Sequence, residues 1–131
     1  MRVRSALSIL PIILAAALAG PAFADGDPAK GEKVFRKCKA CHAVEEGKNK
    51  VGPSLFNVVG RTAGTVEGFR YSKAMEAFGA DGQTWDEDNL SAFLEKPKDL
   101  VDKTKMAFAG LKKEEERADV IAYLKRFGKS E

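Results

Sequence analysis

The chain has very few cysteines and histidines, the usual ligands of structural zinc: two cysteines and one histidine in 131 residues. All three lie within the five residues CKACH, as Cys38, Cys41 and His42. A structural zinc site usually takes four Cys or His ligands. This set is one ligand short, so a carboxylate would have to complete a zinc site, and nothing in the sequence singles one out.

The chain also lacks internal repeats and any alternating apolar–polar stretch long enough for a useful β-strand. In thiol–disulfide oxidoreductases, a C-x-x-C motif usually opens a helix that follows a strand, whereas here it closes a helical stretch. Lys and Arg are interleaved with Asp and Glu and form no basic tract. We therefore expect no nucleic-acid partner.

The first residues have the three parts of a secretory signal peptide. Arg2 and Arg4 form a basic start, residues 6–20 are an uncharged apolar run, and AFA at 22–24 supplies small residues for cleavage. A retained membrane anchor is the alternative. That alternative is disfavoured because the run is short for a bilayer span and Pro11 interrupts it.

These features predict a cleaved signal peptide at 1–24 and one small domain at 25–131, located in the periplasm. Removal of the leader would lower the formal net charge from +3 to +1, since two arginines leave with it. Export would also place both cysteines in an oxidising compartment.

Short amphipathic stretches dominate the remainder, so we predict an all-α fold. Asp27 followed by Pro28 is typical of a helix start. Two long stretches, 43–71 and 97–110, show little periodicity, which is unusual in a compact domain. Four short helices would bury a thin core, so these loops are either loose or wrapped around a bound group. The four helical stretches are 27–38, 72–78, 85–96 and 112–128.

The CKACH motif favours covalent haem attachment over the redox and zinc alternatives. Two thiols three residues apart on one turn can both reach the vinyl groups at a porphyrin edge. His42 would then lie beneath the ring with a nitrogen directed at the iron. A buried porphyrin would also supply the core that the loops lack. We therefore expect one covalently bound haem c.

Elimination leaves few candidates for the second axial ligand of the iron. No second histidine exists, and the remaining soft ligands are Met75 and Met106, with lysine a third choice. Met75 has the pattern of a core residue in a short helix. Met106 lies in an irregular segment that could cross the ring more freely, although a methionine that simply fills a gap in the core is also possible there. The usual His/Met arrangement of electron carriers favours Met106.

Beyond this motif, nearly all of the expected domain resembles class I cytochrome c, especially its mitochondrial and bacterial c2-like branch. The matching segments are GEKVFRKCKACH, VGPSLFNVVGR, GFRYS, TWDEDNL and FLEKPKDLVDKTKMAFAGLKKEEERADVIAYLK. The resemblance implies the small cytochrome c fold, with about four short helices and long loops wrapped around one covalent haem.

The resemblance also implies a role for each matching residue. Cys38 and Cys41 would form the thioethers, His42 and Met106 would be the axial ligands, and Pro53 would accept a hydrogen bond from His42. The residues that would border the haem propionates are Arg61, Tyr71, Trp85 and Thr104. Gly31 and Phe35 would lie where the first helix crosses the last, near Val120 and Tyr123.

Two departures from the family pattern affect the distal side. Phe93 replaces a tyrosine that many members place near the methionine sulfur. Asp102 and Lys103 replace a Pro–Gly turn, which predicts a more mobile loop around Met106.

The function implied by the resemblance is one-electron transport by a monomeric carrier. Transient partners would be a quinol–cytochrome c reductase and a terminal oxidase or photosynthetic reaction centre. Lysines would form a docking face, unless they are simply solvated surface residues. The alternative is a haem peroxidase or a gas or redox sensor with a displaceable methionine ligand. The docking candidates are Lys37, Lys39, Lys98, Lys105, Lys112 and Lys113.

Overall fold

The computed structural model describes residues 25–129, together with Ile12 and Ala15. Apart from those two positions, the predicted signal peptide lies outside the described residues. The described chain forms five helices, and none of them is long and apolar enough to cross a membrane. The helices are α1 (Pro28–Phe35), α2 (Lys73–Ala80), α3 (Glu87–Glu95), α4 (Pro97–Leu100) and α5 (Glu114–Leu124).

The all-α prediction is confirmed for this part of the chain. Between residues 25 and 129 the only β-type pairing is an isolated antiparallel bridge between Thr62 and Thr84. Helix α1 begins as expected, because the Asp27 carboxylate accepts a hydrogen bond from the Ala29 N–H at 2.9 Å and Pro28 is the first helical residue.

Two details of the helix prediction are wrong. Pro97 ends α3, as expected, but it also begins the short helix α4, so the described chain has five helices rather than four. Proline suits a first helical position because it needs no hydrogen-bond partner for its nitrogen. Helix α2 continues through Gly79 instead of stopping there. A Cβ on Gly79 would collide with the Ala63 carbonyl, so this glycine permits close packing.

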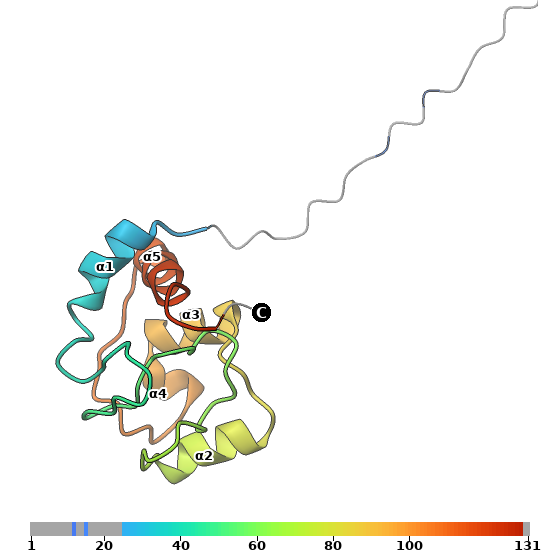
Figure 1. Ribbon diagram of the computed structural model, residues 1–131. Coiled ribbons are helices and arrows are strands. Elements are labelled where there is room, and N and C mark those ends of the chain that lie inside the picture. The colour runs from blue at the N-terminus through green and yellow to red at the C-terminus, as the bar shows by residue number, and fades with distance from the viewer. Residues whose placement is uncertain (1–11, 13–14, 16–24, 130–131) are drawn as a thin grey trace, which may run out of the picture.

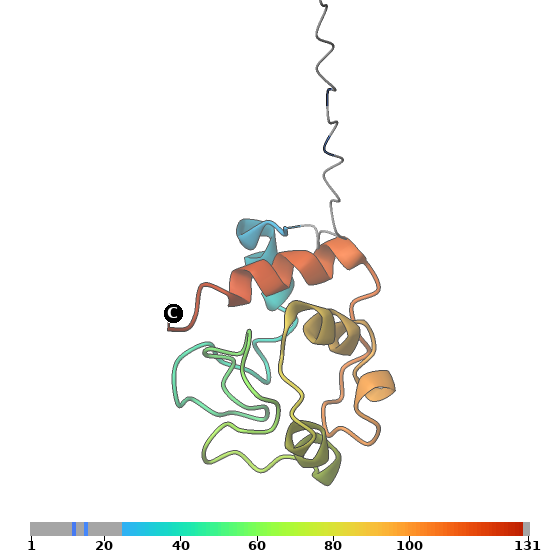
Figure 2. The same ribbon diagram turned by 90° about the vertical axis from the view of Figure 1, so that its right-hand side faces the viewer.

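Helices α1 and α5 cross at close range through a glycine. A Cβ on Gly31 would collide with the carbonyl oxygen of Asp119. Beside this contact, the ring centroids of Phe35 and Tyr123 lie 5.3 Å apart. Figures 1 and 2 both show α1 packed against α5. The predicted crossing of the first and last helices is therefore confirmed.

The irregular segments surround the core below this helix pair. In Figure 2 the loops that follow α1 lie on the left and the segment that leads into α5 returns on the right, with α2 at the bottom. The buried core includes Trp85, Leu90, Phe93 and Leu94, while Cys38 and Met106 pack against it as partly buried residues. The segments containing CKACH and Met106 thus approach one core from different sides.

Candidate cofactor site

The CKACH segment forms a single helical turn just after α1. The amide of Cys38 donates to Phe35 O at 2.8 Å, and the amides of Cys41 and His42 both donate to Cys38 O, at 3.1 and 2.9 Å. Both thiols are free. The turn therefore presents two thiols and one imidazole from adjacent positions, as expected for haem attachment.

The imidazole of His42 is held by the backbone of the following loop. Its Nδ1 lies 2.7 Å from the carbonyl oxygen of Pro53. Because a carbonyl can only accept, Nδ1 must be the protonated nitrogen, which leaves the lone pair on Nε2 for a metal. Gly52 packs against the ring, since a Cβ there would come within 2.8 Å of both ring nitrogens.

Burial favours the uncharged forms of His42 and Cys38. Loss of hydration lowers the pKa of His42, although its hydrogen bond to Pro53 acts in the opposite direction. Neutral imidazole is the form that binds metals. Burial raises the pKa of the Cys38 thiol to about 11. Both effects suit a turn that offers a neutral imidazole at His42 and a protonated thiol at Cys38.

Arg61 is a half-buried cation with a buried donor that has no partner. Its Nη1 donates to the carbonyl oxygens of Ser54 and Phe56, at 3.0 and 2.8 Å. Its Nε is buried and has no hydrogen-bond partner. Burial also lowers the pKa of this guanidinium. A buried N–H without an acceptor is costly, and an anionic carboxylate would satisfy it.

Backbone pairing brings Arg61 beside Trp85. The Trp85 amide donates to Arg61 O at 2.8 Å, and the Gly60 amide donates to Trp85 O at 2.8 Å. Trp85 is buried, and its ring centroid lies 4.9 Å from that of Phe93. The structure thus brings together Arg61 and Trp85, two of the residues expected beside the propionates.

Tyr71 and Thr104 make local hydrogen bonds. The hydroxyl of Tyr71 accepts from the Val66 N–H at 2.9 Å, and burial raises its pKa. The hydroxyl of Thr104 accepts from the Met106 N–H at 3.3 Å. Each hydroxyl keeps a proton that it can donate to another group. Their predicted contact with propionates remains a prediction.

The two candidate methionines occupy different environments. Met75 is buried within α2, where its side chain belongs to the core. Met106 is half-buried in the irregular segment between α4 and α5. We call residues 101–113 the Met106 loop. Of these two methionines, Met106 alone combines a thioether with a position outside a packed helix, which supports the choice made from the sequence.

The predicted docking lysines are all exposed, but they are not equivalent. Lys37 forms an ion pair of 3.9 Å with Glu116. Lys105 donates to Tyr71 O and Lys112 donates to Glu95 O, each at 3.3 Å. These three side chains also contribute local contacts within the chain. The others are Lys39, Lys98 and Lys113.

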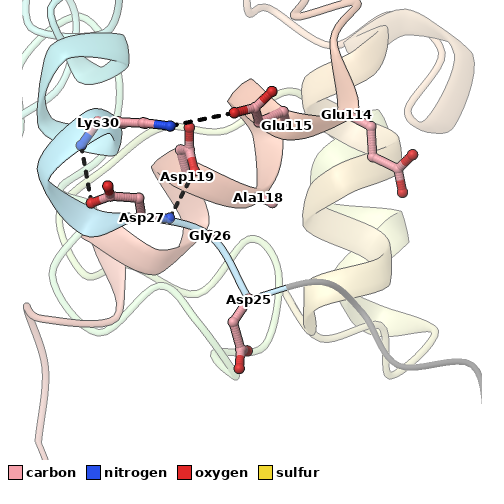
Figure 3. Close-up of a pocket in the computed structure, with 8 residues that line it drawn as sticks. All are labelled: Asp25, Gly26, Asp27, Lys30, Glu114, Glu115, Ala118 and Asp119. Carbon is pink, nitrogen blue, oxygen red and sulfur yellow. Dashed lines mark hydrogen bonds and ion pairs between the residues drawn. The ribbon is translucent and has the colours of Figure 1, made fainter.

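An acidic surface pocket lies between the start of α1 and the first turns of α5 (Figure 3). Asp119 there accepts from the Asp27 N–H at 2.7 Å, and Lys30 pairs with Glu115 at 3.5 Å. None of the predicted site residues lines it. Within residues 25–129, no three Cys, His, Asp or Glu side chains gather in a way that could hold a metal ion by themselves. The contacts in this pocket connect the start of the described domain to α5.

Two site residues were missed at the sequence level. Gly52 supports the His42 ring, and buried Ser54 connects the same loop by donating to Glu45 O at 2.6 Å. The Gly–Pro pair in VGPSL signals an unusual backbone, but the sequence does not show that the imidazole packs on it.

The donor set fits a covalently held haem. One turn offers two thiols for its edge and an imidazole Nε2 for its iron, and a thioether is available from the Met106 loop. The orphaned Nε of Arg61 would find an acceptor in a propionate. A zinc ion is a cation and would offer no acceptor to the Nε of Arg61.

Comparisons with known proteins agree with this geometry. The family model for cytochrome c matches residues 28–127. Cytochrome c-554 of Methylosinus trichosporium is 48% identical over 129 residues, 98% of this chain and 96% of the relative. Cytochrome c2 of Afifella marina is 53% identical over 100 residues, 76% of this chain and 81% of the relative. The structure of cytochrome c2 from Rhodospirillum centenum has a TM-score of 0.75 and 45% identity, covering 79% of this chain and all of that one.

Proposed function

The chain belongs to the cytochrome c family of electron-transfer proteins, which bind haem c covalently and are not enzymes, and we propose that it is a periplasmic carrier with His42 and Met106 as axial ligands. Its electrons would come from a quinol–cytochrome c reductase. They would pass to a terminal oxidase or a photosynthetic reaction centre.

The observation that supports this proposal most strongly is the His42–Pro53 contact at 2.7 Å within the CKACH turn. It assigns the proton to Nδ1 and leaves the lone pair on Nε2 for the iron. Haem, when bound, supplies an Fe(II)/Fe(III) couple that exchanges one electron. Cys38 and Cys41 would hold its edge as thioethers, so the imidazole stays aligned in both oxidation states.

Met106 and the burial of the haem would both raise the reduction potential. A thioether ligand stabilises the ferrous state relative to harder ligands and raises the potential. A dry environment acts the same way, because the ferric centre has one more positive charge. If His42 and Met106 both held the iron, no position would remain for a substrate, which would suit a carrier.

Arg61 would neutralise a buried propionate through its unpaired Nε. Tyr71, Trp85 and Thr104 would complete the hydrogen bonding around these carboxylates. Burying a carboxylate without such donors is costly. The side chain of Arg61 is already fixed by two carbonyl acceptors, so little entropy would be lost when a propionate binds.

The exposed lysines would form a docking face for the membrane complexes. A local positive face speeds association with acidic partners, up to about 10⁸–10⁹ M⁻¹s⁻¹ at low salt. Since the Debye length is about 8 Å at physiological ionic strength, salt should slow the reaction. The protein would act as a monomer. The proposed lysines are Lys37, Lys39, Lys98, Lys105, Lys112 and Lys113.

Export would deliver the chain to the compartment where it would exchange electrons with these partners. We expect cleavage after Ala24, which leaves residues 25–131 as the working protein. Intact mass measurement on protein purified from cells competent in cytochrome maturation should give the mass of 25–131 plus one haem. A protein without covalent haem would overturn the functional proposal. A retained leader would overturn only the predicted cleavage after Ala24.

The axial assignment is tested by the ferric optical spectrum. A weak near-infrared methionine–iron band should be present in the wild type and lost in Met106→Ala. Met75→Leu is the matched control, because Met75 is buried in α2 and the change conserves volume. A band that survives in Met106→Ala would rule out Met106 as the ligand.

A further inference from the structure

Arg117 is a buried cation that contacts the end of the Met106 loop. Only 8% of its surface is exposed. Its Nη1 donates to Leu111 O and Lys112 O, at 2.8 and 3.0 Å, and its Nε donates to Ser91 Oγ of α3 at 3.0 Å. Within residues 25–129 it forms no ion pair. Its charge is therefore compensated by loop carbonyls and a hydroxyl.

Leu111 is thereby held from both sides of its backbone. While its carbonyl accepts from Arg117, its amide donates to Leu94 O of α3 at 2.7 Å. Its side chain is also buried. Next to it, Gly110 packs so closely on Glu95 O that a Cβ would collide with that oxygen. This end of the loop is fixed to α3 and α5 together.

The loop starts at the buried Val101, but the stretch from Lys103 to Met106 is held less well. Lys103 adopts a left-handed backbone with φ 63°, which is unfavourable for a residue with a side chain. Lys103 is exposed, and the nearby Thr104 amide makes a single turn-type bond to Val101 O at 3.1 Å. The Met106 amide has only a 3.3 Å bond to Thr104 Oγ1.

We propose that Arg117 is a positioning residue for Met106: its bonds to Leu111 O and Lys112 O set the cost of moving the thioether away from the iron. This inference rests on the proposed axial role of Met106. Leu111 lies five positions after Met106. If the backbone at Leu111 is freed, Met106 can therefore move away from the iron. Because the contacts at Lys103 are weak, the loop depends on its Leu111 end to stay closed.

The cost of opening can be measured with imidazole, which competes with Met106 for the ferric iron. An external ligand binds only when the loop is open. Its apparent dissociation constant is therefore the intrinsic constant divided by the open fraction. The near-infrared band reports the fraction of protein with Met106 bound, so a titration at constant pH measures the opening equilibrium without requiring electron-transfer activity.

The test compares Arg117→Gln with the wild-type holoprotein. We expect the apparent dissociation constant for imidazole to fall about tenfold, the equivalent of about 1.4 kcal/mol. Asp119→Asn is the matched control. Asp119 is buried in the same helix, but its hydrogen bond goes to the Asp27 amide at 2.7 Å, in the anchor of α1. This control should lose global stability and keep the imidazole constant within about twofold.

Arg117→Lys serves as a second variant if the glutamine variant yields no holoprotein. Lysine retains the charge but lacks the planar set of donors that reaches two carbonyls and a hydroxyl together, so the imidazole constant should again fall. A wild-type band together with an unchanged constant in whichever variant folds would overturn the inference alone. A wild-type protein without the band would overturn the axial assignment and this inference together.

Discussion

The imidazole of His42 lies directly on the backbone of Gly52, so that an added Cβ would come within 2.8 Å of both ring nitrogens. The next residue supplies the carbonyl that orients the ring, at 2.7 Å from Nδ1. The loop therefore controls the position of the ligand by contact at one residue and by hydrogen bonding at the next.

Gly52→Ala should weaken the proximal side of the site. The new methyl group must displace either the ring or the loop, which should cost about 1–3 kcal/mol of stability as an overpacking change. Purified protein should show reduced haem content and a lower denaturation midpoint followed in the Soret band. Val51→Ala is the control, because the Val51 side chain is largely exposed. Equal haem content and stability in Gly52→Ala and Val51→Ala would contradict this account.

Arg61→Gln should lower the reduction potential. The guanidinium is a positive charge that disfavours the ferric state, which has the greater positive charge, so its loss favours oxidation. We expect a fall of tens of millivolts, and a tenfold change in a one-electron equilibrium corresponds to about 59 mV. Protein-film voltammetry would measure it. Arg70→Gln removes an exposed arginine, whose charge is screened by water and salt, and should change the potential far less. A shift of the same size in both variants would argue against a propionate contact at Arg61.

Tyr123 should make stability decline in alkaline solution. Burial, with the nearby Glu32 adding to it, raises its pKa above the ordinary value of 10.0. Above that pH the unfolded chain loses this proton while the folded protein keeps it, so the contribution is fully present below about pH 10 and is lost as pH rises.

The comparison of Tyr123 with Tyr123→Phe isolates this contribution, since other groups that titrate cancel. Urea unfolding at about pH 8 and pH 11 should show the wild type losing more stability than the variant over that interval. Parallel losses would show that the Tyr123 hydroxyl titrates alike in the folded and unfolded chain.

Lys103→Gly should stabilise the Met106 loop. Lys103 has φ 63°, and glycine adopts this conformation without steric cost. We expect a gain of about 0.5–1 kcal/mol, reduced by the greater freedom of glycine in the unfolded chain, and a higher apparent dissociation constant for imidazole. Lys98→Gly in α4 is the contrasting variant and should destabilise, because glycine is unfavourable in a helix. A loss of stability in Lys103→Gly would show that the turn gains something from the lysine side chain.

At Lys103, the sequence predicted one feature of the loop and missed another. The replacement of a Pro–Gly turn by Asp102–Lys103 was visible in the sequence and predicted a looser loop. The positive φ at Lys103 shows that the chain retains a glycine-type conformation there without a glycine. Likewise Pro97 was recognised as a helix stop, but its second role as the start of α4 depends on the backbone that follows it.

Local chemistry made the haem turn and the α1 start at Asp27 predictable from the sequence, because each depends on residues a few positions apart. The crossing at Gly31 was implied by the resemblance to class I cytochrome c. The buried Arg117, the orphaned Nε of Arg61 and the glycine beneath His42 were decided only by the tertiary structure. Each depends on groups brought together across loops, where burial determines whether a charge or a hydrogen bond donor has a partner. Sequence patterns specify which side chains are present, whereas their hydration and their partners follow from the packing of distant segments.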